Sequence, residues 1–276
     1  MVNKENTVIV IVTYNPDASF INIIEIHSQI ASKVIIVDNG SIADNCIHSK
    51  AIQSIPNLEI IYSQINKGIA WALNCGIKLA LISNPKWILT FDQDSKPVFN
   101  ILNYYNKIIT LNRNIGLVGI NFGPHERNID NLNDLVLIDT LTVITSGTLH
   151  NVDIFARVGY YNEELFIDSV DFDFTLRVKQ CGYRTVRITN ITLEHRLGSP
   201  LVKKGVESSN HNAFRRYYMA RNHIIITKRY FKHFPIFCIK KTYFFITSVI
   251  RMIIVDTDKR TKIKHTISGI IDGLKY

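Results

Sequence analysis

Four short runs of apolar, largely β-branched residues, separated by stretches of helix length, set the strongest limit on how this chain can fold. The runs cover residues 8–13, 34–38, 58–62 and 87–92. Continuous apolar runs of about four to eight residues are typical of strands buried on both faces. Stretches long enough for crossover helices lie between them, at 20–31, 43–54 and 69–82. Strand–helix–strand units of this spacing predict a parallel sheet with right-handed crossovers.

Polar or turn-forming residues follow each of the four apolar runs. They are Thr13-Tyr14-Asn15-Pro16, Asp38-Asn39-Gly40-Ser41, Asn66-Lys67-Gly68 and Asp92-Gln93-Asp94-Ser95. Any one of these clusters alone resembles an ordinary turn. In an open parallel sheet, however, ligands bind outside the carboxyl ends of the strands. Four polar clusters at that one edge therefore predict a ligand-binding site.

The rest of the chain divides into a mixed section and a helical tail. Short strands are expected at 116–122 and 135–145, and helices near 152–158 and 170–181. From residue 208 onward, the pattern predicts helices rich in Arg, Lys, Tyr and Phe. The predicted fold class is α/β, with a Rossmann-like, mostly parallel sheet, a mixed section and C-terminal helices.

The positive charge of the chain is concentrated near its C-terminus. Residues 196–276 carry 17 Lys and Arg against 4 Asp and Glu, a net charge of +13, whereas residues 1–195 have a net charge of −4. This asymmetry indicates an anionic partner for the tail, which is nucleic acid, anionic lipid or a phosphorylated substrate. A basic solvated surface without a partner is the plain alternative.

Composition limits the class and compartment of the protein. With 46% hydrophobic and 20% charged residues, wholesale disorder is excluded. The four cysteines are far apart in sequence, which favours reduced cytosolic thiols over a disulfide scaffold or a zinc finger. The sequence lacks the run of about 18 uncharged apolar residues that a membrane span needs, and the apolar run at 8–12 is too short for a signal peptide. A cytoplasmic protein is expected.

Two carboxylates, Asp92 and Asp94, directly follow the last buried run. Alternate strand residues point to the same side, so at a strand end both can bind one divalent cation. Oxygen ligands without cysteine suit Mg²⁺ or Mn²⁺. Exposed turn carboxylates are the alternative. His195 is a further candidate ligand beside such a site, although a lone histidine is more often structural.

A second acidic cluster contains Asp168, Asp171 and Asp173. Asp173 and Arg177 are four residues apart on an expected helix, where an ion pair is the plain interpretation. Asp171 lies near the start of that helix, where exposed amides favour a carboxylate. A carboxylate beside a cleft can also take a proton from a hydroxyl nucleophile. The sequence lacks the loops that define dinucleotide oxidoreductases, P-loop proteins and serine hydrolases.

Several segments, in order along the chain, resemble the inverting GT-A glycosyltransferases of family 2. They are VIVIVTYNP, IIVDNGS, NKGIAWALNCGI, WILTFDQDS, TSGTLHNVDIFARVGYYNEELFIDSVDFDFTLRVKQCGYR and ITLEHRLG. The form DQDS, together with FIDSVDFDF and LEHRLG, is most similar to the bacterial rhamnosyltransferase branch. The resemblance implies a GT-A catalytic domain over 1–205, with a nucleotide-sugar half at about 1–115 and an acceptor half at about 116–205. A basic, aromatic-rich helical region over 206–276 follows it.

The resemblance also implies a role for each matching residue. The nucleotide-sugar donor would be held by Thr13, Tyr14, Asn15, Asp38, Asn39, Asn66, Gly68, Asn74, Asp92 and Gln93. The metal, Mg²⁺ or Mn²⁺, would be bound by Asp92, Asp94 and His195. The acceptor or a diphosphate would lie against Asp168, Arg215 and Arg221.

The implied reaction moves L-rhamnose from dTDP-L-rhamnose to a hydroxyl of a lipid-linked bacterial surface polysaccharide intermediate. Asp171 would deprotonate that hydroxyl, and one base with direct displacement inverts the anomeric carbon. The family usually has Glu-Asp where this chain has Val170-Asp171, which leaves Asp168 and Asp173 as alternative bases. Another donor, a UDP-hexose or a UDP-furanose, is the nearest alternative within the class.

For the basic tail, the resemblance implies a peripheral place at the inner face of the cell membrane. Apolar side chains would lie in the lipid interface, namely Phe234, Ile236, Phe237, Tyr243, Phe244 and Phe245. Packing of these residues into a core or a homodimer is an equal alternative. A nucleotidyltransferase and a nucleic-acid-binding protein are the alternatives of other classes. The first lacks its Gly-rich triphosphate loop here and the second lacks a known module, so no nucleic-acid partner is expected.

Overall fold

The structure is a computed structural model that describes residues 1–276 apart from 43–45, 124, 130, 196–200 and 204. The chain divides into two compact units. The first comprises Met1–Glu163 and Phe174–Arg196. The second comprises Glu164–Asp173 and Leu197–Tyr276.

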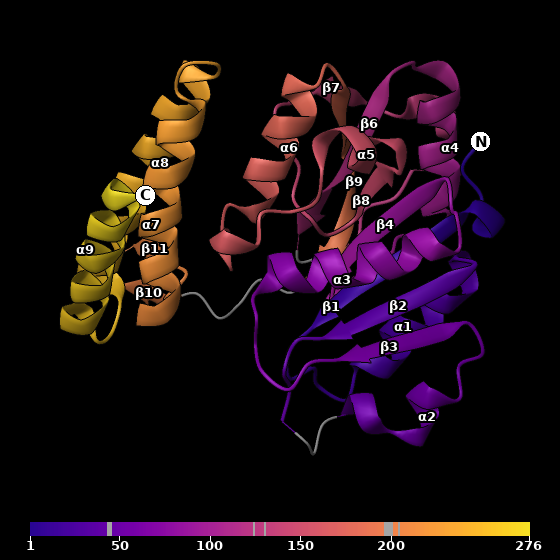
Figure 1. The fold of residues 1–276 in the computed structure, drawn as a ribbon, viewed down its shortest axis with the longest axis horizontal. Helices are drawn as coiled ribbons and strands as arrows, with labels where there is room; N and C mark the ends of the chain where they lie inside the picture. Colours follow the sequence, from indigo (N-terminus) through magenta and orange to yellow (C-terminus); the bar gives the residue numbers. More distant parts are fainter. Residues whose placement is uncertain (43–45, 124, 130, 196–200, 204) are drawn as a thin grey trace. The chain divides into compact units, whose positions relative to one another are not determined.

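Four parallel strands form one half of the sheet in the first unit (Figure 1). They lie in the order β3-β2-β1-β4 and cover Leu58–Tyr62, Lys33–Asp38, Thr7–Thr13 and Trp87–Asp92. Every residue of β1 is buried, as expected for a central strand covered on both faces. All four strands predicted from the apolar runs are confirmed.

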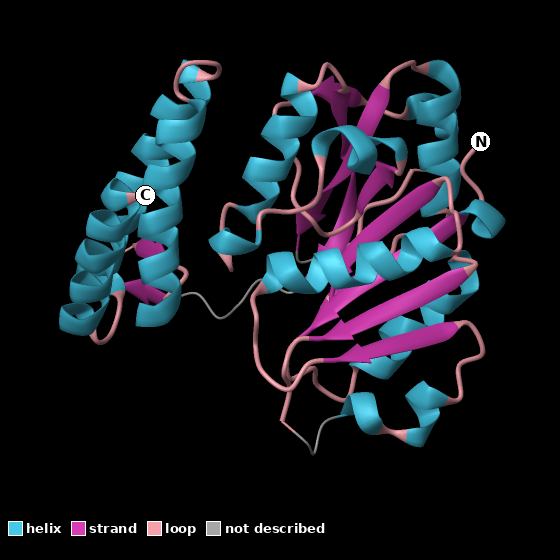
Figure 2. Cartoon of the chain, viewed as in Figure 1, coloured by secondary structure: helices cyan, strands magenta, loops and turns pink. Residues whose placement is uncertain are grey.

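Helices cover both faces of this parallel half. The helix α3 (Ile69–Ile82) lies in front of the sheet in Figure 2, and α1 (Phe20–Ile30) lies behind it. The predicted continuous helix at 43–54 is wrong for its described residues, which form a 3-10 turn, Cys46–His48, and a short helix α2, Lys50–Gln53. The reason is Ser49, whose side chain accepts from the Ile52 amide and starts a new helix there.

The other half of the sheet is mixed. The short strand β8 (Thr148–Asn151) is inserted between β4 and β6 (Ile115–Gly123) and is antiparallel to both. The long strand β9 (Arg184–His195) runs parallel to β6. Two short strands pair antiparallel with β9, namely β5 (Ser95–Lys96) and β7 (Leu137–Asp139). The helices of this half are α4 (Ile101–Leu111), α5 (Asp153–Val158) and the greater part of α6 (Val170–Gln180), whose residues 170–173 belong to the second unit.

The expected strand at 135–145 is shorter than predicted, because only β7 pairs with β9. After Asp139 the chain turns, and the Thr140 hydroxyl accepts from the Thr142 amide at 3.4 Å. The turn leads to Ser146 and Gly147, and the Gly147 amide donates to the Thr90 carbonyl of β4 at 2.8 Å. This segment therefore hydrogen-bonds to β4 instead of extending the sheet.

The second unit is helical. It contains a hairpin of β10 (Leu201–Lys203) and β11 (Val206–Ser208), followed by α7 (Ala213–Tyr230), α8 (Pro235–Val255) and α9 (Lys259–Lys275). The predicted tail helices are confirmed, whereas the hairpin was not predicted. The helices α7 and α9 approach closely at Gly269, which has no side chain. A β-carbon at this position would stand only 2.3 Å from the Tyr217 carbonyl oxygen.

Three charged side chains are buried among these helices. The Asp256 carboxylate lies 2.9 Å from the Lys262 ammonium and 3.5 Å from the Arg216 guanidinium. Arg216 also donates to the Ser248 hydroxyl at 2.8 Å, and Lys262 donates to the Asn210 side chain at 2.7 Å. Removing one partner of such a buried pair is costly because it leaves an uncompensated charge, so this cluster ties α7, α8 and α9 together. Among the helices of the described residues, none is long and apolar enough to cross a membrane.

Candidate active site

The carboxyl ends of β1, β2 and β4 are joined by side-chain hydrogen bonds. The Thr13 hydroxyl at the end of β1 donates to the Asp38 carboxylate at the end of β2, at 3.2 Å. The Tyr14 amide donates to the Gln93 side-chain oxygen after β4, at 2.7 Å. Ser41 also donates to Asp38. Three of the four predicted polar clusters thus meet at one edge of the sheet.

The fourth cluster joins the same edge through paired amides. The Asn39 side chain donates to the Asn66 side-chain oxygen at 3.1 Å, and that oxygen also accepts from the Gly68 amide at 3.0 Å. The backbone approaches closely at Gly40, whose φ is +87° and whose added β-carbon would stand 2.5 Å from the Asn66 nitrogen. Only glycine fits both conditions, so Gly40 allows the two loops to pack closely against each other.

Asn15 belongs to this edge as well. Its amide donates to the Ser41 hydroxyl at 2.7 Å, and its side-chain oxygen accepts from the Ile42 amide at 2.9 Å. Thr13, Asp38 and Asn39 are buried, whereas the Tyr14 side chain is 49% exposed. The edge therefore has a polar floor of buried, hydrogen-bonded side chains, and an exposed aromatic ring follows it in the chain.

The Asp92-Gln93-Asp94 segment is fixed by neighbouring serines. The Asp92 amide donates to the Ser146 hydroxyl at 3.2 Å, and that hydroxyl donates to the Ser95 hydroxyl at 2.6 Å. Both serines are fully buried, while Asp92 and Asp94 are partly exposed. The acidic side chains are thus held at a defined strand end and remain accessible.

The backbone brings His195 to the same place. In the antiparallel pairing of β5 with β9, His195 lies opposite Ser95, the residue after Asp94. The side chain of His195 lies outside the described part of the structure. Among the side chains that are described, no group of three or more metal-binding residues occurs.

The donor set at this strand end fits a divalent metal of the kind expected. Asp92 and Asp94 supply carboxylate oxygens, the ligands that Mg²⁺ and Mn²⁺ prefer. An imidazole at the paired position would complete a set of oxygen and nitrogen donors, which Mn²⁺ accepts. Metal binding by these three residues stays a prediction.

Asn74 has a structural part that the sequence did not reveal. Its side chain is buried and donates to the Tyr161 carbonyl at 2.9 Å and to the Glu163 carboxylate at 2.8 Å. It also accepts from the Tyr161 amide at 2.9 Å. Asn74 therefore anchors the 161–163 segment to α3, and its predicted contact with a nucleotide stays a prediction.

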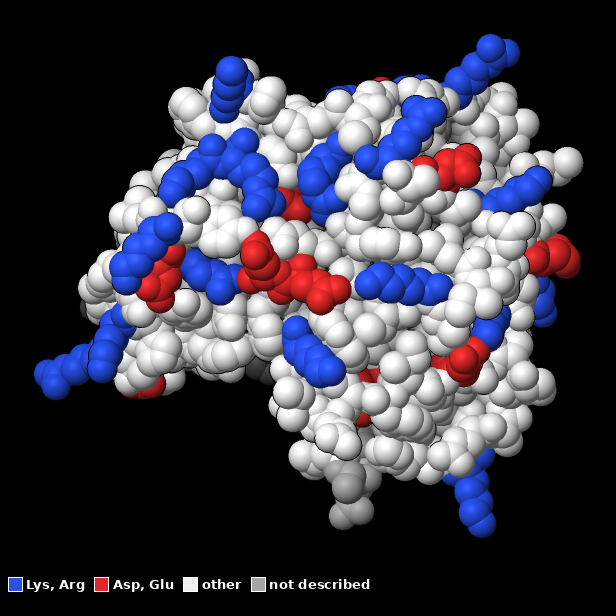
Figure 3. Space-filling view, in the orientation of Figure 1, with Lys and Arg blue, Asp and Glu red and all other residues white. Residues whose placement is uncertain are grey.

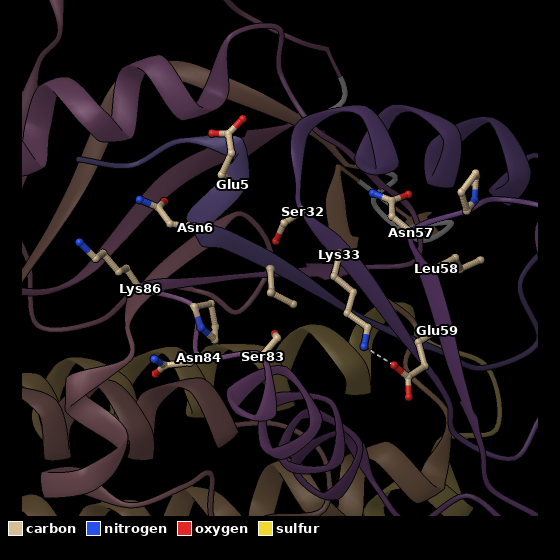
Figure 4. A pocket seen from close by; sticks show the side chains of 13 residues that line it. Glu5, Asn6, Ser32, Lys33, Asn57, Leu58, Glu59, Ser83, Asn84 and Lys86 are labelled. Atoms are coloured by element: carbon tan, nitrogen blue, oxygen red, sulfur yellow. Dashed lines mark ion pairs between the residues drawn. The ribbon is translucent and has the colours of Figure 1, made fainter.

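A hollow of about 650 Å³ in the first unit lies at the opposite edge of the sheet (Figure 4). Its lining includes Asn6, Lys33 and Leu58, which stand at the amino ends of β1, β2 and β3. Lys33 and Glu59 form an ion pair there. Ligands of open parallel sheets bind beyond the carboxyl ends of the strands. This hollow lies at their amino ends, so it is separate from the predicted site.

In the second unit, one asparagine holds the segment that carries the second acidic cluster. The Asn222 side-chain nitrogen donates to the carbonyls of Leu165, Ile167 and Asp168, at 2.7, 2.8 and 2.9 Å. Asn222 lies on α7 and is fully buried. Phe166, Asp168 and Ser169 have φ values of +60°, +64° and +63°, a conformation that L-residues seldom adopt. Asn222 stabilises this unusual backbone.

Two predicted arginines also bind this segment. Arg215 makes a two-pronged contact with Asp168, with Nη2 3.0 Å from Oδ1 and Nε 3.1 Å from Oδ2. Arg221 donates to the Glu164 carbonyl, and its guanidinium lies 4.7 Å from the centre of the Tyr218 ring. The structure thus brings Asp168, Arg215 and Arg221 together.

The carboxyl group of Asp171 has a pKa that its surroundings shift. Burial raises the pKa of its carboxyl group to about 6, opposed by the Phe172 amide, which donates to it at 2.8 Å, and by the Lys241 ammonium. The Lys241 ammonium donates to the Ser169 hydroxyl at 3.0 Å and lies 4.3 Å from the centre of the Phe172 ring. Burial lowers the pKa of Lys241 to about 8, against the pull of Asp171. A carboxyl group with a pKa near 6 is ionised at neutral pH and basic enough to accept a proton.

Asp173 is bound differently. Its carboxylate is fully buried, 2.6 Å from the Arg229 guanidinium and 2.9 Å from the Tyr230 hydroxyl. These contacts give Asp173 a structural part within the second unit. They favour Asp171 over Asp173 as the residue that exchanges protons.

Four residues that shape these sites had no individual role assigned from the sequence. Ser41 was only a member of a predicted polar cluster, and Ser146, Asn222 and Lys241 were given no task. The signal for Asn222 is a poor helix former in the middle of a helix, which points to a specific hydrogen-bonding task. For Lys241 the only local signal is a charge within the largely apolar stretch 234–255. The two serines lie in segments that look like ordinary turns.

The comparisons with known proteins agree on one family. The family described as Glycosyl transferase family 2 matches residues 8–103. The dTDP-rhamnosyl transferase RfbF of Shigella flexneri is 30% identical over 99% of this chain and 96% of its own length.

Two solved structures share the fold. The mannosyltransferase PcManGT from Pyrobaculum calidifontis, in complex with GDP-Man and Mn²⁺, has a TM-score of 0.61 at 14% identity, covering 95% of this chain and 74% of its own. GalNAc-T7 with UDP, GalNAc and Mn²⁺ has a TM-score of 0.64 at 12% identity, covering 99% of this chain and 56% of its own.

Proposed function

This chain belongs to glycosyltransferase family 2 and is a glycosyltransferase, and we propose that it moves L-rhamnose from dTDP-L-rhamnose to a hydroxyl of a lipid-linked bacterial surface polysaccharide intermediate. The proposal rests on the full-length similarity to a protein named as a dTDP-rhamnosyl transferase. Membership of this family also means that the activity is glycosyl transfer and not the alternative, nucleotidyl transfer.

We assign donor binding to the carboxyl edge of the parallel strands. Asp38, fixed by Thr13 and Ser41, would accept hydrogen bonds from the pyrimidine or ribose of the nucleotide. The exposed Tyr14 ring would lie against the base. Hydrogen bonds already hold the side chains of this floor, so little side-chain freedom would be lost when the donor binds.

We assign the diphosphate to the end of β4. Asp92 and Asp94, with His195, would hold Mg²⁺ or Mn²⁺. When bound, this ion would neutralise the charge that develops on the departing nucleoside diphosphate. The hydrogen bonds from the Asp92 amide to Ser146, and from Ser146 to Ser95, would hold the Asp92 backbone in place when the donor binds.

We assign the base to Asp171. The acceptor hydroxyl would lose its proton to this carboxylate while its oxygen forms a bond to the anomeric carbon. The bond from that carbon to the diphosphate breaks, and dTDP leaves. One displacement from the opposite face inverts the configuration, as in the inverting hydrolases with a sugar hydroxyl in place of water. Arg215 would fix Asp168 beside the base or meet an acceptor diphosphate.

We place the enzyme in the cytoplasm, at the inner face of the cell membrane, where a lipid-linked acceptor would be reached. The experiment is a donor panel. The purified chain is incubated with Mn²⁺ and dTDP-L-rhamnose, a UDP-hexose or a UDP-furanose, and release of the nucleotide is measured. Turnover restricted to dTDP-L-rhamnose supports the proposal. Turnover of a UDP-sugar with indifference to dTDP-L-rhamnose overturns the rhamnose assignment and leaves the glycosyltransferase class intact.

A further inference from the structure

One side of α8 is lined by large apolar residues that are exposed. Along α8, the side chains of Ile236, Ile239, Tyr243, Ile246, Ile250 and Ile253 are 45–70% exposed. They follow one another at steps of three and four residues, which places them in a single stripe along the helix. Phe244, 67% exposed, lies beside this stripe. Exposed apolar patches of this extent mark an interaction site.

The stripe continues onto α9. Ile267, Ile271 and Leu274 are 47–60% exposed and are spaced by four and three residues. An open groove of about 250 Å³ lies between the two helices, lined by apolar side chains and by Thr266. We call the exposed residues of α8 and α9, with this groove, the apolar face. It is two helices wide, broader than the single seam of a coiled coil.

Cations border the apolar face, and acids are scarce around it. Lys240 and Arg251 of α8 are exposed, and this helix contains no acidic residue. In α9, Arg260 and Lys264 are exposed, and the one acid, Asp272, accepts from the Tyr217 hydroxyl at 3.0 Å. Figure 3 shows Lys and Arg side chains over α8 and α9. The face therefore combines apolar area with unbalanced positive charge.

We propose that the apolar face docks onto an anionic phospholipid surface, with its isoleucines and aromatic rings at the boundary between headgroups and acyl chains. Helices with a broad apolar side and a basic border bind such surfaces. A second copy of this chain fits less well, because it would bring two acid-free copies of α8, each with exposed Lys240 and Arg251, against one another. The inference rests on the proposed place at the membrane, but not on the donor or the base.

The structure also revises which residues can touch lipid. Phe237 is half-buried and contacts the Phe172 ring, with centroids 5.8 Å apart. Phe245 stacks on His223, with centroids 4.6 Å apart. Phe237 packs within the unit, so its predicted lipid contact gives way to the isoleucine stripe. Phe245 also lines the groove and therefore stays part of the apolar face.

The test is sedimentation of the full chain with lipid vesicles. We expect binding to vesicles that contain phosphatidylglycerol, weak binding to pure phosphatidylcholine, and loss of binding as salt is raised. Lys240→Gln should weaken the partition by about fivefold, as expected for one cation near an anionic surface. Ile239→Ser with Phe244→Ser should weaken it further, because both side chains are exposed and contribute apolar area.

The matched control is Ile82→Ser with Phe99→Ser, two side chains in the first unit that are 79% and 74% exposed. This variant should bind vesicles like the unchanged chain. Equal binding by the Ile239→Ser/Phe244→Ser variant would overturn the proposal. Failure of the unchanged chain to bind vesicles would also overturn it. So would a dimer of the unchanged chain, seen in ultracentrifugation, that becomes a monomer in the Ile239→Ser/Phe244→Ser variant. Nucleotide release from the donor, measured without vesicles, should be the same in all variants, which separates this inference from the proposed reaction.

Discussion

Replacing Asn222 by alanine tests whether one amide holds the segment that carries the proposed base. The amide donates to three carbonyls at 2.7, 2.8 and 2.9 Å. It has two hydrogens, so we count two full bonds at about 1 kcal/mol each and about 1 kcal/mol for a buried carbonyl left unpaired. We expect Asn222→Ala to lower the free energy of unfolding of the second unit by about 2–3 kcal/mol.

The assay has to report on the second unit. Both tryptophans, Trp71 and Trp87, lie in the first unit, so their fluorescence would miss the change. Hydrogen exchange of the amides between 165 and 173, followed by mass spectrometry, reports on the segment directly. Asn103→Ala, at an exposed position of α4, is the matched control and should leave this exchange unchanged. If Asn222→Ala left the exchange of the segment unchanged, the reasoning would be refuted.

Three further predictions concern the base, the metal and helix packing. Since the pKa of Asp171 is about 6, the transfer rate should rise with pH through about 6. Lys241→Met removes a cation that stabilises the carboxylate, so this rise should move to higher pH. Lys241→Arg keeps the cation and should return the rise to its original pH. An unshifted profile would contradict the coupling. Asp94→Ala should weaken donor binding by about 10–100-fold in Mn²⁺, measured by calorimetry, and have no effect with a chelator. Gly269→Ala should lower the free energy of unfolding by about 1–3 kcal/mol by overpacking α9 against α7, whereas the exposed neighbour Ser268→Ala should not.

The parallel half of the sheet was predictable because each of its strands can be recognised from its own residues, without knowledge of its neighbours in the sheet. A strand buried on both faces, such as 8–13, is apolar at nearly every position. The carboxyl-edge clusters follow from that topology alone, which is why Thr13, Asp38 and Gln93 could be grouped in advance. The family resemblance then supplied their roles.

The mixed half and the second acidic segment were harder to foresee because their structure depends on contacts between distant residues. The strand β8 has four residues and is defined by its neighbours β4 and β6. The partners of Asn222 are 54–57 residues away along the chain, and Ser169 is 72 residues from Lys241. Local propensity carries no record of such contacts.

The central claim, that Asp171 takes the proton from the acceptor hydroxyl, is tested most directly by the transfer rate of Asp171→Asn. Asparagine keeps the size of the side chain and removes its basicity. The account predicts a rate lower by about a hundredfold or more, with dTDP affinity unchanged in calorimetry. A rate equal to that of the unchanged chain would contradict the account and move the base to Asp168 or Asp173.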